Sequence, residues 1–502
     1  MGIPAYYKKL VSERPTLVAT SHPSEVISWL FMDFNCLIYH CLHRADCPVY
    51  PGDSQKETWE GEFLECVVRY SQRIIEDVSP QTGVMIAIDG VVPMAKMRQQ
   101  RLRRFQSVWR REHSVQWDTN SITPGTRFMA ALRERLERML VGHPTWKLSS
   151  SDEPGEGEHK IMAEWRTCAY EGNYAVYGLD ADLIVLSLLS QQCCSLTNQI
   201  WLFREEMEKG MVVYREEGVE QFEWFSIDVL RDWLTRNTEE KRAFLLTYCF
   251  AMSILGNDFL PSSLGLKMRD DGHSELLEMI GMLMVRNISL VYPHTQEVCM
   301  EGLHGLFRLL SASEEKRIEA YIGKKQRFAR GAVETGMGEV NWPLGNMEEC
   351  ALLEGSHLAA NWQERYRSFF SGHPIKRMVH DYLYGIQWIW SYYTGRMDEV
   401  CFNWYYPFSL PPLWKWVTGE CEFPGTVRIK AHDIRTVEQL ALVLPLESWS
   451  LIPPCKEKKF PYLAPQFFPS KFTFESVGKR FFWECEAQIP MPSIGELKAL
   501  MR

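Results

Sequence analysis

The sequence predicts a protein of the α/β class, in which a mostly parallel β-sheet is flanked by helices. Between residues 1 and 285, short apolar runs alternate with amphipathic stretches, which is the order expected when each strand of a sheet leads into a helix. Three of these runs, Val26–Asp33, Gly83–Asp89 and Asn173–Asp180, are predominantly apolar and end at an acid. Such runs are typical of parallel strands buried on both faces, so we expect helices on both sides of the sheet.

The ends of the three predicted strands supply the first candidate residues. Asp33, Asp89 and Asp180 are the last residues of the three apolar runs. Ligands of open α/β sheets bind outside the carboxyl ends of the strands, where parallel strands all end at the same edge. We therefore expect the three carboxylates to converge on one site if the strands are neighbours.

Four further acids stand in contexts that favour the same site. Glu156 and Glu158 lie in the segment PGEGEHK, whose glycines allow a tight backbone and let two nearby carboxylates converge. Asp182 lies two residues after Asp180, the spacing that also separates Glu156 and Glu158, at the point where the third strand leads into a helix. Asp258 follows a long apolar helical stretch that ends at a glycine.

So many acids at one edge of a sheet repel one another unless cations neutralise them. Hard divalent cations with oxygen ligands, Mg²⁺ or Mn²⁺, suit such a set, and two of them can activate water and stabilise the leaving oxygen of a phosphodiester. The simpler alternative is that each acid caps a helix or is a solvated loop charge, which explains a single acid more easily than the clustered set. The predicted metal ligands, which are also the predicted catalytic residues, are Asp33, Asp89, Glu156, Glu158, Asp180, Asp182 and Asp258.

A basic helix is predicted directly after the second strand. The segment Lys96–Arg111 holds seven basic residues and no acid. Counted from Lys96, the positions i, i+4, i+7 and i+8 share one face of a helix. The guanidinium groups of arginine and the charge of a lysine on that face suit a terminal phosphate. A merely solvated basic helix is the alternative, but the closeness of the segment to Asp89 favours a phosphate pocket. The predicted pocket residues are Lys96, Gln100, Arg103 and Arg104.

An aromatic stretch in the last third of the chain supplies candidates for base stacking. Tyr382–Phe408 contains eleven aromatic residues, and we expect most of them to be buried in a core. The segment Phe402–Pro407 is less periodic than the helical part before it. One exposed ring in that segment would be able to stack on a base, as in proteins that bind single strands.

The overall charge argues in the opposite direction from the basic helix. The chain has 55 basic and 64 acidic residues and a net charge of −9, whereas nucleic-acid-binding proteins are usually basic. The distribution of charge matters more than its sum, however, and the basic helix concentrates positive charge beside the acids. The net charge therefore does not exclude a nucleic-acid substrate.

The remaining composition is that of an intracellular globular protein. The 14 cysteines form no CxxC pair, so we expect reduced thiols and no zinc site. The first residues lack the apolar segment of a signal peptide, and the longest apolar runs are too short to span a membrane. We expect no membrane partner and an intracellular location, with the cytoplasm favoured and the nucleus left open.

The chain divides into three predicted segments. Residues 1–285 carry the α/β pattern and form the predicted catalytic domain. Residues 286–345 are irregular apart from a charged helix at Glu314–Gln326, and we interpret them as a variable linker or insertion. Residues 346–502 combine an aromatic helix, His373–Tyr393, with proline-rich loops, so we expect this second region to wrap around the catalytic domain.

With these residues in place, the chain resembles the XRN family of 5′→3′ exoribonucleases. The resemblance rests on ordered blocks along nearly the whole chain, among them MGIPAYYKKLVSERP, MDFNCLIYHC, AIDGVVPMAKMRQQRLRRF, PGEGEHKIM, GLDADLIVLSL and GNDFLP. Further blocks in the second region include YLYGIQWIWSYY, NWYYPF and FFPSKF. The resemblance implies a PIN/Rossmann-like nuclease fold, here as a compact catalytic core without the long C-terminal extension of the cytoplasmic members.

The resemblance also implies an activity and roles for the residues. The family hydrolyses RNA processively from a 5′-monophosphate to mononucleotides with Mg²⁺ or Mn²⁺, so we expect single-stranded RNA with a 5′-monophosphate as the partner of a monomeric enzyme. The acids stand at the family's metal-site positions, and the face of the basic helix stands at its phosphate-pocket positions. Members grip the terminal bases between a histidine and a tryptophan. Here Tyr39 takes the histidine position with His40 adjacent, and Trp404 is the candidate tryptophan.

Two other functions stay open at this point. A structure-specific flap or PIN-type nuclease also uses clustered acids on an α/β sheet, and cleavage inside branched DNA would favour it. An inactive RNA-binding scaffold would bind RNA but no Mn²⁺, and the intact set of acids argues against it. The leading hypothesis is a metal-dependent 5′→3′ exoribonuclease.

Overall fold

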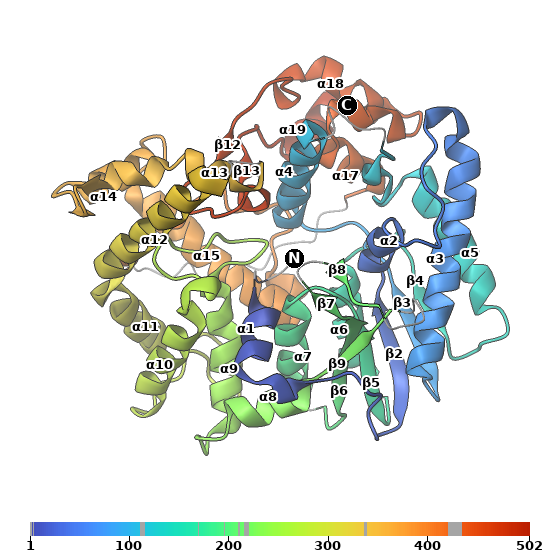
Figure 1. The fold of residues 1–502 in the computed structure, drawn as a ribbon, viewed down its shortest axis with the longest axis horizontal. Coiled ribbons are helices and arrows are strands. Elements are labelled where there is room, and N and C mark those ends of the chain that lie inside the picture. Colours follow the sequence, from blue (N-terminus) through green and yellow to red (C-terminus); the bar gives the residue numbers. More distant parts are fainter. Residues whose placement is uncertain are drawn as a thin grey trace.

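The computed structural model has the predicted α/β architecture, with one mostly parallel sheet flanked by helices (Figure 1). The strands of this sheet, in spatial order, are β1 (Val18–Ala19), β9 (Phe222–Ser226), β6 (Ile200–Glu205), β5 (Asn173–Tyr177), β2 (Ile27–Asp33), β3 (Gly83–Ala87) and β4 (Lys147–Ser149). The strands from β6 to β4 pair in parallel, and β9 and β1 add antiparallel pairs at one edge. The structure describes residues 3, 5–110, 116–168, 170–194, 196–208, 211–214, 220–335, 339–419 and 434–502.

The order of the parallel strands reverses next to β2. The strands β2, β3 and β4 follow one another toward one edge of the sheet, whereas β5 and β6 lie on the other side of β2. A reversal of this kind opens a crevice at the carboxyl ends of the two central strands, and α/β proteins bind ligands there. By this rule, the expected ligand position lies beside the end of β2 at Asp33 and the end of β5 at Tyr177.

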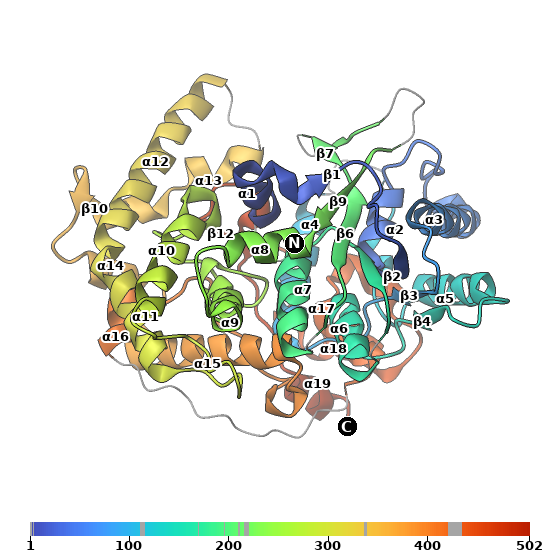
Figure 2. The ribbon, with the colours of Figure 1, turned by 90° about the horizontal axis from the view of Figure 1, so that it is seen from below.

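Helices cover both faces of the sheet because the strand side chains alternate between them. Phe31 of β2 packs in one core with α6 (Gly157–Thr167) and α7 (Asp182–Cys193). Its neighbours Leu30 and Met32 pack in a second core with α3 (Lys56–Val78) and α5 (Arg127–Leu140). Both ribbon views show these two pairs of helices on opposite sides of the sheet (Figures 1 and 2).

The basic segment forms α4 (Met94–Arg110), which the second region of the chain encloses. The backbone N–H of Val92 donates to Oε1 of Gln439 in α17 (Thr436–Val443) at 2.9 Å. The fully buried guanidinium of Arg101 donates to the carbonyl oxygen of Leu442 at 2.9 Å. The second region therefore packs directly against α4 and the turn before it. Arg111, the last residue of the predicted basic segment, lies outside the described residues.

The chain between the two regions is largely helical where the structure describes it. The charged helix predicted at Glu314–Gln326 is longer in the structure, as α12 (Glu314–Thr335), and α11 (Met300–Ala312) precedes it. The aromatic helix forms α15 (Ile375–Thr394), close to the predicted bounds. The boundaries of the three predicted segments stay predictions.

The expectation of reduced thiols is wrong at one place. Cys47, in the loop after α2 (Asn35–Cys41), forms a disulfide with Cys66 of α3, and their Cα atoms lie 5.7 Å apart.

Among the helices of the described ranges, none is long and apolar enough to cross a membrane. The other helices, apart from short 3₁₀ turns, are α1 (Tyr6–Glu13), α8 (Ile227–Leu234), α9 (Lys241–Ala251), α10 (Gly272–Met284), α13 (Trp342–Gly345), α14 (Trp362–Ser368), α16 (Trp414–Gly419), α18 (Phe460–Leu463) and α19 (Ile494–Leu500). The short strand pairs are β7 (Met207–Glu208) with β8 (Met211–Val212), β10 (Leu353–Glu354) with β11 (His357–Leu358), and β12 (Phe474–Glu475) with β13 (Glu486–Ala487).

Candidate active site

Three carboxylates form the centre of the candidate site. One oxygen atom each of Asp33, Asp89 and Glu158 lies within 4.8 Å of the other two. Asp33 ends β2, Asp89 follows β3, and Glu158 lies in the first turn of α6. Asp33 and Glu158 are buried. Carboxylates this close in a buried site are a suitable ligand set for a hard divalent cation, which would neutralise their mutual repulsion.

Gly157 allows α6 to approach the end of β2. A Cβ atom at this position would lie 2.4 Å from Oδ1 of Asp33, so a larger residue would displace the carboxylate. The backbone N–H of Gly157 also donates to Oδ1 of Asp89 at 2.7 Å. Asn35 donates from Nδ2 to the other oxygen of Asp89 at 3.0 Å. Gly157 therefore holds Asp89 by a hydrogen bond and leaves the space that the Asp33 carboxylate occupies.

Lys96 lies between two further carboxylates of the cluster. Its Nζ atom is 2.5 Å from Oε2 of Glu156 and 2.8 Å from Oδ2 of Asp258. Burial alone would raise the pKa of Asp258, but the Lys96 ammonium outweighs this effect and holds that pKa at about 2. The backbone reaches Asp258 through Gly256, whose φ of +92° is a left-handed conformation that favours glycine. Lys96 therefore contacts predicted metal ligands in this structure.

Asp180 and Asp182 complete the cluster at the end of β5. Asp182 is the first residue of α7 and is buried. Burial, and then the nearby Asp180 carboxylate, raise the pKa of Asp182 to about 7. Burial also raises the pKa of Asp33, and the charges of Asp89, Asp180 and Asp182 raise it further. The structure thus brings the seven predicted acids to one edge of the sheet.

Tyr392 of α15 joins the site, although sequence reasoning did not select it. Its hydroxyl donates to Oε1 of Glu156 at 2.8 Å. Its ring stacks on His159 with the ring centroids 3.8 Å apart. No local signal identifies this tyrosine, because 236 residues separate it from Glu156 and the aromatic helix reads as a core element. The second region therefore contributes a side chain directly to the acidic cluster.

The face of the basic helix provides groups that fit an anion. The buried Nη1 atom of Arg104 and the buried Oε1 atom of Gln100 have no hydrogen-bond partner among the described residues. Burial lowers the pKa of Arg104 to about 10, which leaves the guanidinium charged at neutral pH. Arg103 is exposed on the same helix. A buried guanidinium N–H without an acceptor is costly, and a phosphate oxygen would satisfy it.

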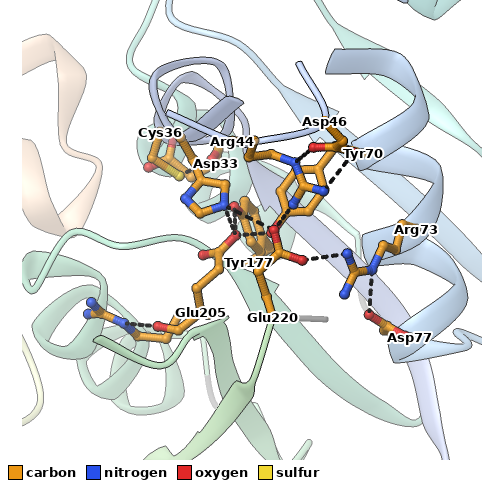
Figure 3. Close-up of polar contacts among 12 residues, drawn as sticks. Asp33, Cys36, Arg44, Asp46, Tyr70, Arg73, Asp77, Tyr177, Glu205 and Glu220 are labelled. Atoms are coloured by element: carbon orange, nitrogen blue, oxygen red, sulfur yellow. Dashed lines mark hydrogen bonds and ion pairs between the residues drawn. The ribbon is translucent and has the colours of Figure 1, made fainter. Parts of the chain in front are cut away.

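The two adjacent candidates for stacking, Tyr39 and His40, point in different directions. Tyr39 is 44% exposed. The His40 ring stacks on Tyr70 with centroids 5.2 Å apart, and its Nε2 atom lies 3.7 Å from Oε1 of Glu205. Figure 3 shows Tyr70 and Glu205 in a polar cluster with Arg44, Tyr177 and Glu220. The structure does not bring His40 into the acidic site, because neighbouring residues of a helix occupy different faces.

Trp404 lies near the beginning of the basic helix. Its half-buried ring packs against Tyr384 and Trp388 of α15, with centroid distances of 5.5 and 5.4 Å. The carbonyl oxygen of Phe402, two residues earlier, accepts a hydrogen bond from the backbone N–H of Met94 at 2.8 Å. The loop is therefore attached to the first residue of α4. The stacking role of Trp404 stays a prediction.

Comparison with known proteins gives one consistent result. Residues 1–206 match the family model described as XRN 5′-3′ exonuclease N-terminus. The chain is 25% identical to 5′-3′ exoribonuclease 1 of Homo sapiens, in a match that covers 98% of this chain and 33% of the relative. It is 28% identical to 5′-3′ exoribonuclease 2 of Saccharomyces cerevisiae, over 56% of this chain and 35% of the relative. It is 24% identical to 5′-3′ exoribonuclease 2 of Arabidopsis thaliana, over 98% of this chain and 66% of the relative.

Proposed function

We propose that this chain, whose residues 1–206 match the model of the XRN 5′-3′ exonuclease N-terminus, is a 5′→3′ exoribonuclease of that family. It would hydrolyse RNA processively from a 5′-monophosphate end and release mononucleotides. The observation that carries the proposal is the cluster of Asp33, Asp89 and Glu158, whose oxygens lie within 4.8 Å of one another. The basic helix α4 follows the same strand end. A carboxylate cluster beside a phosphate-binding helix provides what hydrolysis of a terminal phosphodiester requires.

The acidic cluster is the proposed site for Mg²⁺ or Mn²⁺, and we expect two ions. The residues that would hold them are Asp33, Asp89, Glu156, Glu158, Asp180, Asp182 and Asp258. Ions bound there would supply an activated water and neutralise charge on the departing oxygen. The chain itself orients the carboxylates: the N–H of Gly157 holds Asp89, and the hydroxyl of Tyr392 holds Glu156. These contacts fix ligand positions before the substrate arrives.

The proposed pocket for the 5′-phosphate consists of Gln100, Arg103 and Arg104, with Lys96 as a fourth member. The unsatisfied Nη1 atom of Arg104 is the strongest support for this assignment. A 5′-hydroxyl would leave that guanidinium unpaired, and a cap would be too large for a pocket that fits a phosphate. Lys96 is able to serve the phosphate only after it leaves Glu156 and Asp258, which a cation on those carboxylates would permit.

The substrate we propose is single-stranded RNA, and the enzyme we propose is a monomer. Tyr39 and Trp404 would stack on the terminal bases and hold the strand in register. The exposure of Tyr39 supports its part in this grip. The location we propose is intracellular, in the cytoplasm before the nucleus.

Three RNAs of the same sequence test the function, one each with a 5′-monophosphate, a 5′-hydroxyl and a cap. With Mg²⁺, we expect the monophosphorylated RNA to be degraded to mononucleotides and the other two to be largely resistant. Chelation of the metal should abolish degradation of all three. Equal degradation of the three RNAs would contradict the phosphate pocket, and cleavage within branched DNA would favour a flap-type nuclease instead.

A further inference from the structure

A cavity of about 690 Å³ opens beside the candidate active site. Asp258 and Arg103 line it on the active-site side, and α12 and the segment 478–486 line it on the other side. The volume is within the range of small-molecule sites, which is about 300–1,000 Å³. Among the described residues, Tyr39 and Arg104 do not line the cavity. The cavity therefore extends away from Tyr39, the exposed stacking candidate.

Lysine side chains give part of this cavity a positive charge. The Nζ atom of Lys267 donates to Oγ of Ser262 at 3.1 Å and lies 5.2 Å from the centroid of the Tyr321 ring. Burial, and then the charge of Lys479, lower the pKa of Lys267 to about 8. A cation that is short of solvent and next to a second cation gains stability when an anion binds to both.

The acids that line the same cavity have cationic partners of their own. Asp270 pairs with Lys324, and Glu484 lies 3.1 Å from the guanidinium of Arg269. Glu486 pairs with Arg98 at 2.8 Å and lies 3.8 Å from Nζ of Lys479. Within the described residues, Lys267 forms no ion pair with these acids. The charge of Lys267 is therefore available to a ligand.

An aromatic surface lines the cavity near these lysines. The rings of Phe481 and Trp483 stack with centroids 4.2 Å apart and an angle of 8° between their planes. Trp483 is 40% exposed, so part of its indole remains free. The guanidinium groups of Arg269 and Arg480 lie 4.7 and 4.8 Å from the Phe481 centroid. An exposed indole beside cationic groups suits a nucleobase, since stacking accepts any base.

We propose that this cavity binds the nucleoside 5′-monophosphate that the active site releases. Its phosphate would lie near Lys267 and Lys479, and its base would stack on Trp483. The released nucleotide carries the phosphate that Arg103 contacted, and Arg103 lines the cavity, so the product has a direct path into it. The inference rests on the proposed function, because that function supplies the mononucleotide.

Calorimetry with adenosine 5′-monophosphate tests this site in the 502-residue chain without metal. We expect the wild type to bind the nucleotide, and Trp483→Ala to weaken binding by about 10-fold, because stacking on an aromatic ring contributes about 1–3 kcal/mol per base. Lys267→Met should weaken it to a similar degree. Tyr462→Ala and Lys56→Met, which change residues outside the cavity, should bind as the wild type does. Melting temperatures show whether each variant is folded. Because the Trp483 side chain is partly exposed, we expect Trp483→Ala to fold.

Two results would overturn the inference. The first is equal binding of the nucleotide by the wild type, Trp483→Ala and Lys267→Met. The second is that Trp483→Ala weakens binding of a 5′-phosphorylated RNA decamer as much as that of the mononucleotide, since the cavity would then be the path of the strand. If RNA is degraded to mononucleotides but neither substitution changes nucleotide binding, this inference fails and the proposed function stands. If both substitutions weaken nucleotide binding but RNA is not degraded, the proposed function fails, and with it the identification of the ligand as a product.

Discussion

The Nζ atom of Lys96 lies 2.5 Å from Oε2 of Glu156, and this ion pair joins the basic helix to the acidic cluster. The same ammonium lies 2.8 Å from Oδ2 of Asp258. Glu156 is fully buried, so its carboxylate depends on this lysine and on Tyr392 for compensation of its charge. The protein thus supplies one positive charge of its own to the proposed metal site.

Replacing Lys96 by methionine should destabilise the metal-free protein by about 3–5 kcal/mol, the usual cost of removing one partner of a buried ion pair. Mn²⁺ should then stabilise the variant more than the wild type, because the cation takes over the compensation of charge. Thermal unfolding with EDTA and with MnCl₂ measures both effects. Lys56→Met is the control, since Lys56 makes a long surface pair of 3.9 Å with Glu60, and such a pair contributes little to stability. Equal stabilisation of the variant and the wild type by Mn²⁺ would contradict this account of Lys96.

Tyr392→Phe removes the hydroxyl that donates to Glu156 and keeps the ring. We expect Mn²⁺ to bind about 10-fold more weakly, because groups that orient a metal ligand typically contribute about that much affinity. Calorimetric titration with Mn²⁺ measures the Kd. Tyr384→Phe is the matched control. It removes a hydroxyl from the same helix, but the ring of Tyr384 packs on Trp404 and not on Glu156. An unchanged Kd in Tyr392→Phe would show that Glu156 does not need this hydroxyl.

Substitution of Tyr39 and His40 distinguishes between the two stacking candidates. Tyr39→Ala should weaken binding of 5′-phosphorylated RNA by about 10-fold through lost stacking, with little change in Tm, because the side chain is 44% exposed. His40→Ala should lower the Tm instead, since it removes the ring that stacks on Tyr70 beside Glu205. Fluorescence anisotropy in EDTA measures RNA binding without cleavage. The reverse pattern, with RNA binding sensitive only to His40, would overturn the assignment.

A buried histidine predicts loss of stability in acid. His273 is fully buried, and its ring accepts or donates one hydrogen bond with the Tyr248 hydroxyl at 2.9 Å. Burial lowers the pKa of His273 to about 4, despite Glu13 nearby. Between pH 6.5 and 4 the unfolded chain therefore binds a proton that the folded protein does not, so stability falls as the pH falls, by about 3 kcal/mol in all.

His273→Gln removes this titration while keeping a polar group for Tyr248. Denaturant unfolding at a series of pH values should show a shallower loss of stability between pH 6.5 and 4.5 in the variant than in the wild type. Parallel curves for His273→Gln and the wild type would show that this histidine is not the source of the acid sensitivity.

Features that depend on local sequence pattern could be predicted for this chain. The apolar runs ending at Asp33, Asp89 and Asp180 located three strands, and the reversal of strand order beside β2 explains why their ends meet. The contact between Tyr392 and Glu156 could not be predicted, because a hydrogen bond across 236 residues leaves no periodic signal. Helical periodicity also places adjacent residues on different faces. The sequence could therefore have predicted that Tyr39 and His40 point in different directions, although not which of the two is buried against Tyr70 and Glu205.

Other features depend on how distant segments pack. The disulfide between Cys47 and Cys66 joins a loop to a helix, and the spacing of the two residues matches no short motif. The cavity beside Asp258 is lined from α4, α12 and the segment 478–486, which are far apart in the chain. Lys96 was predicted to face a phosphate, but in the structure it pairs with Glu156 and Asp258. These acids come from other segments of the chain, so the pairing depends on the tertiary fold.

The release of mononucleotides from a 5′-monophosphorylated RNA with Mg²⁺, compared between the wild type and Asp182→Asn, tests the central claim most directly. We predict that the wild type releases only mononucleotides. The variant, shown by its Tm to be folded, should lose at least about 100-fold in rate because a proposed metal-binding carboxylate has become an amide. Equal rates for the two proteins, or longer fragments as the first products of the wild type, would contradict the account.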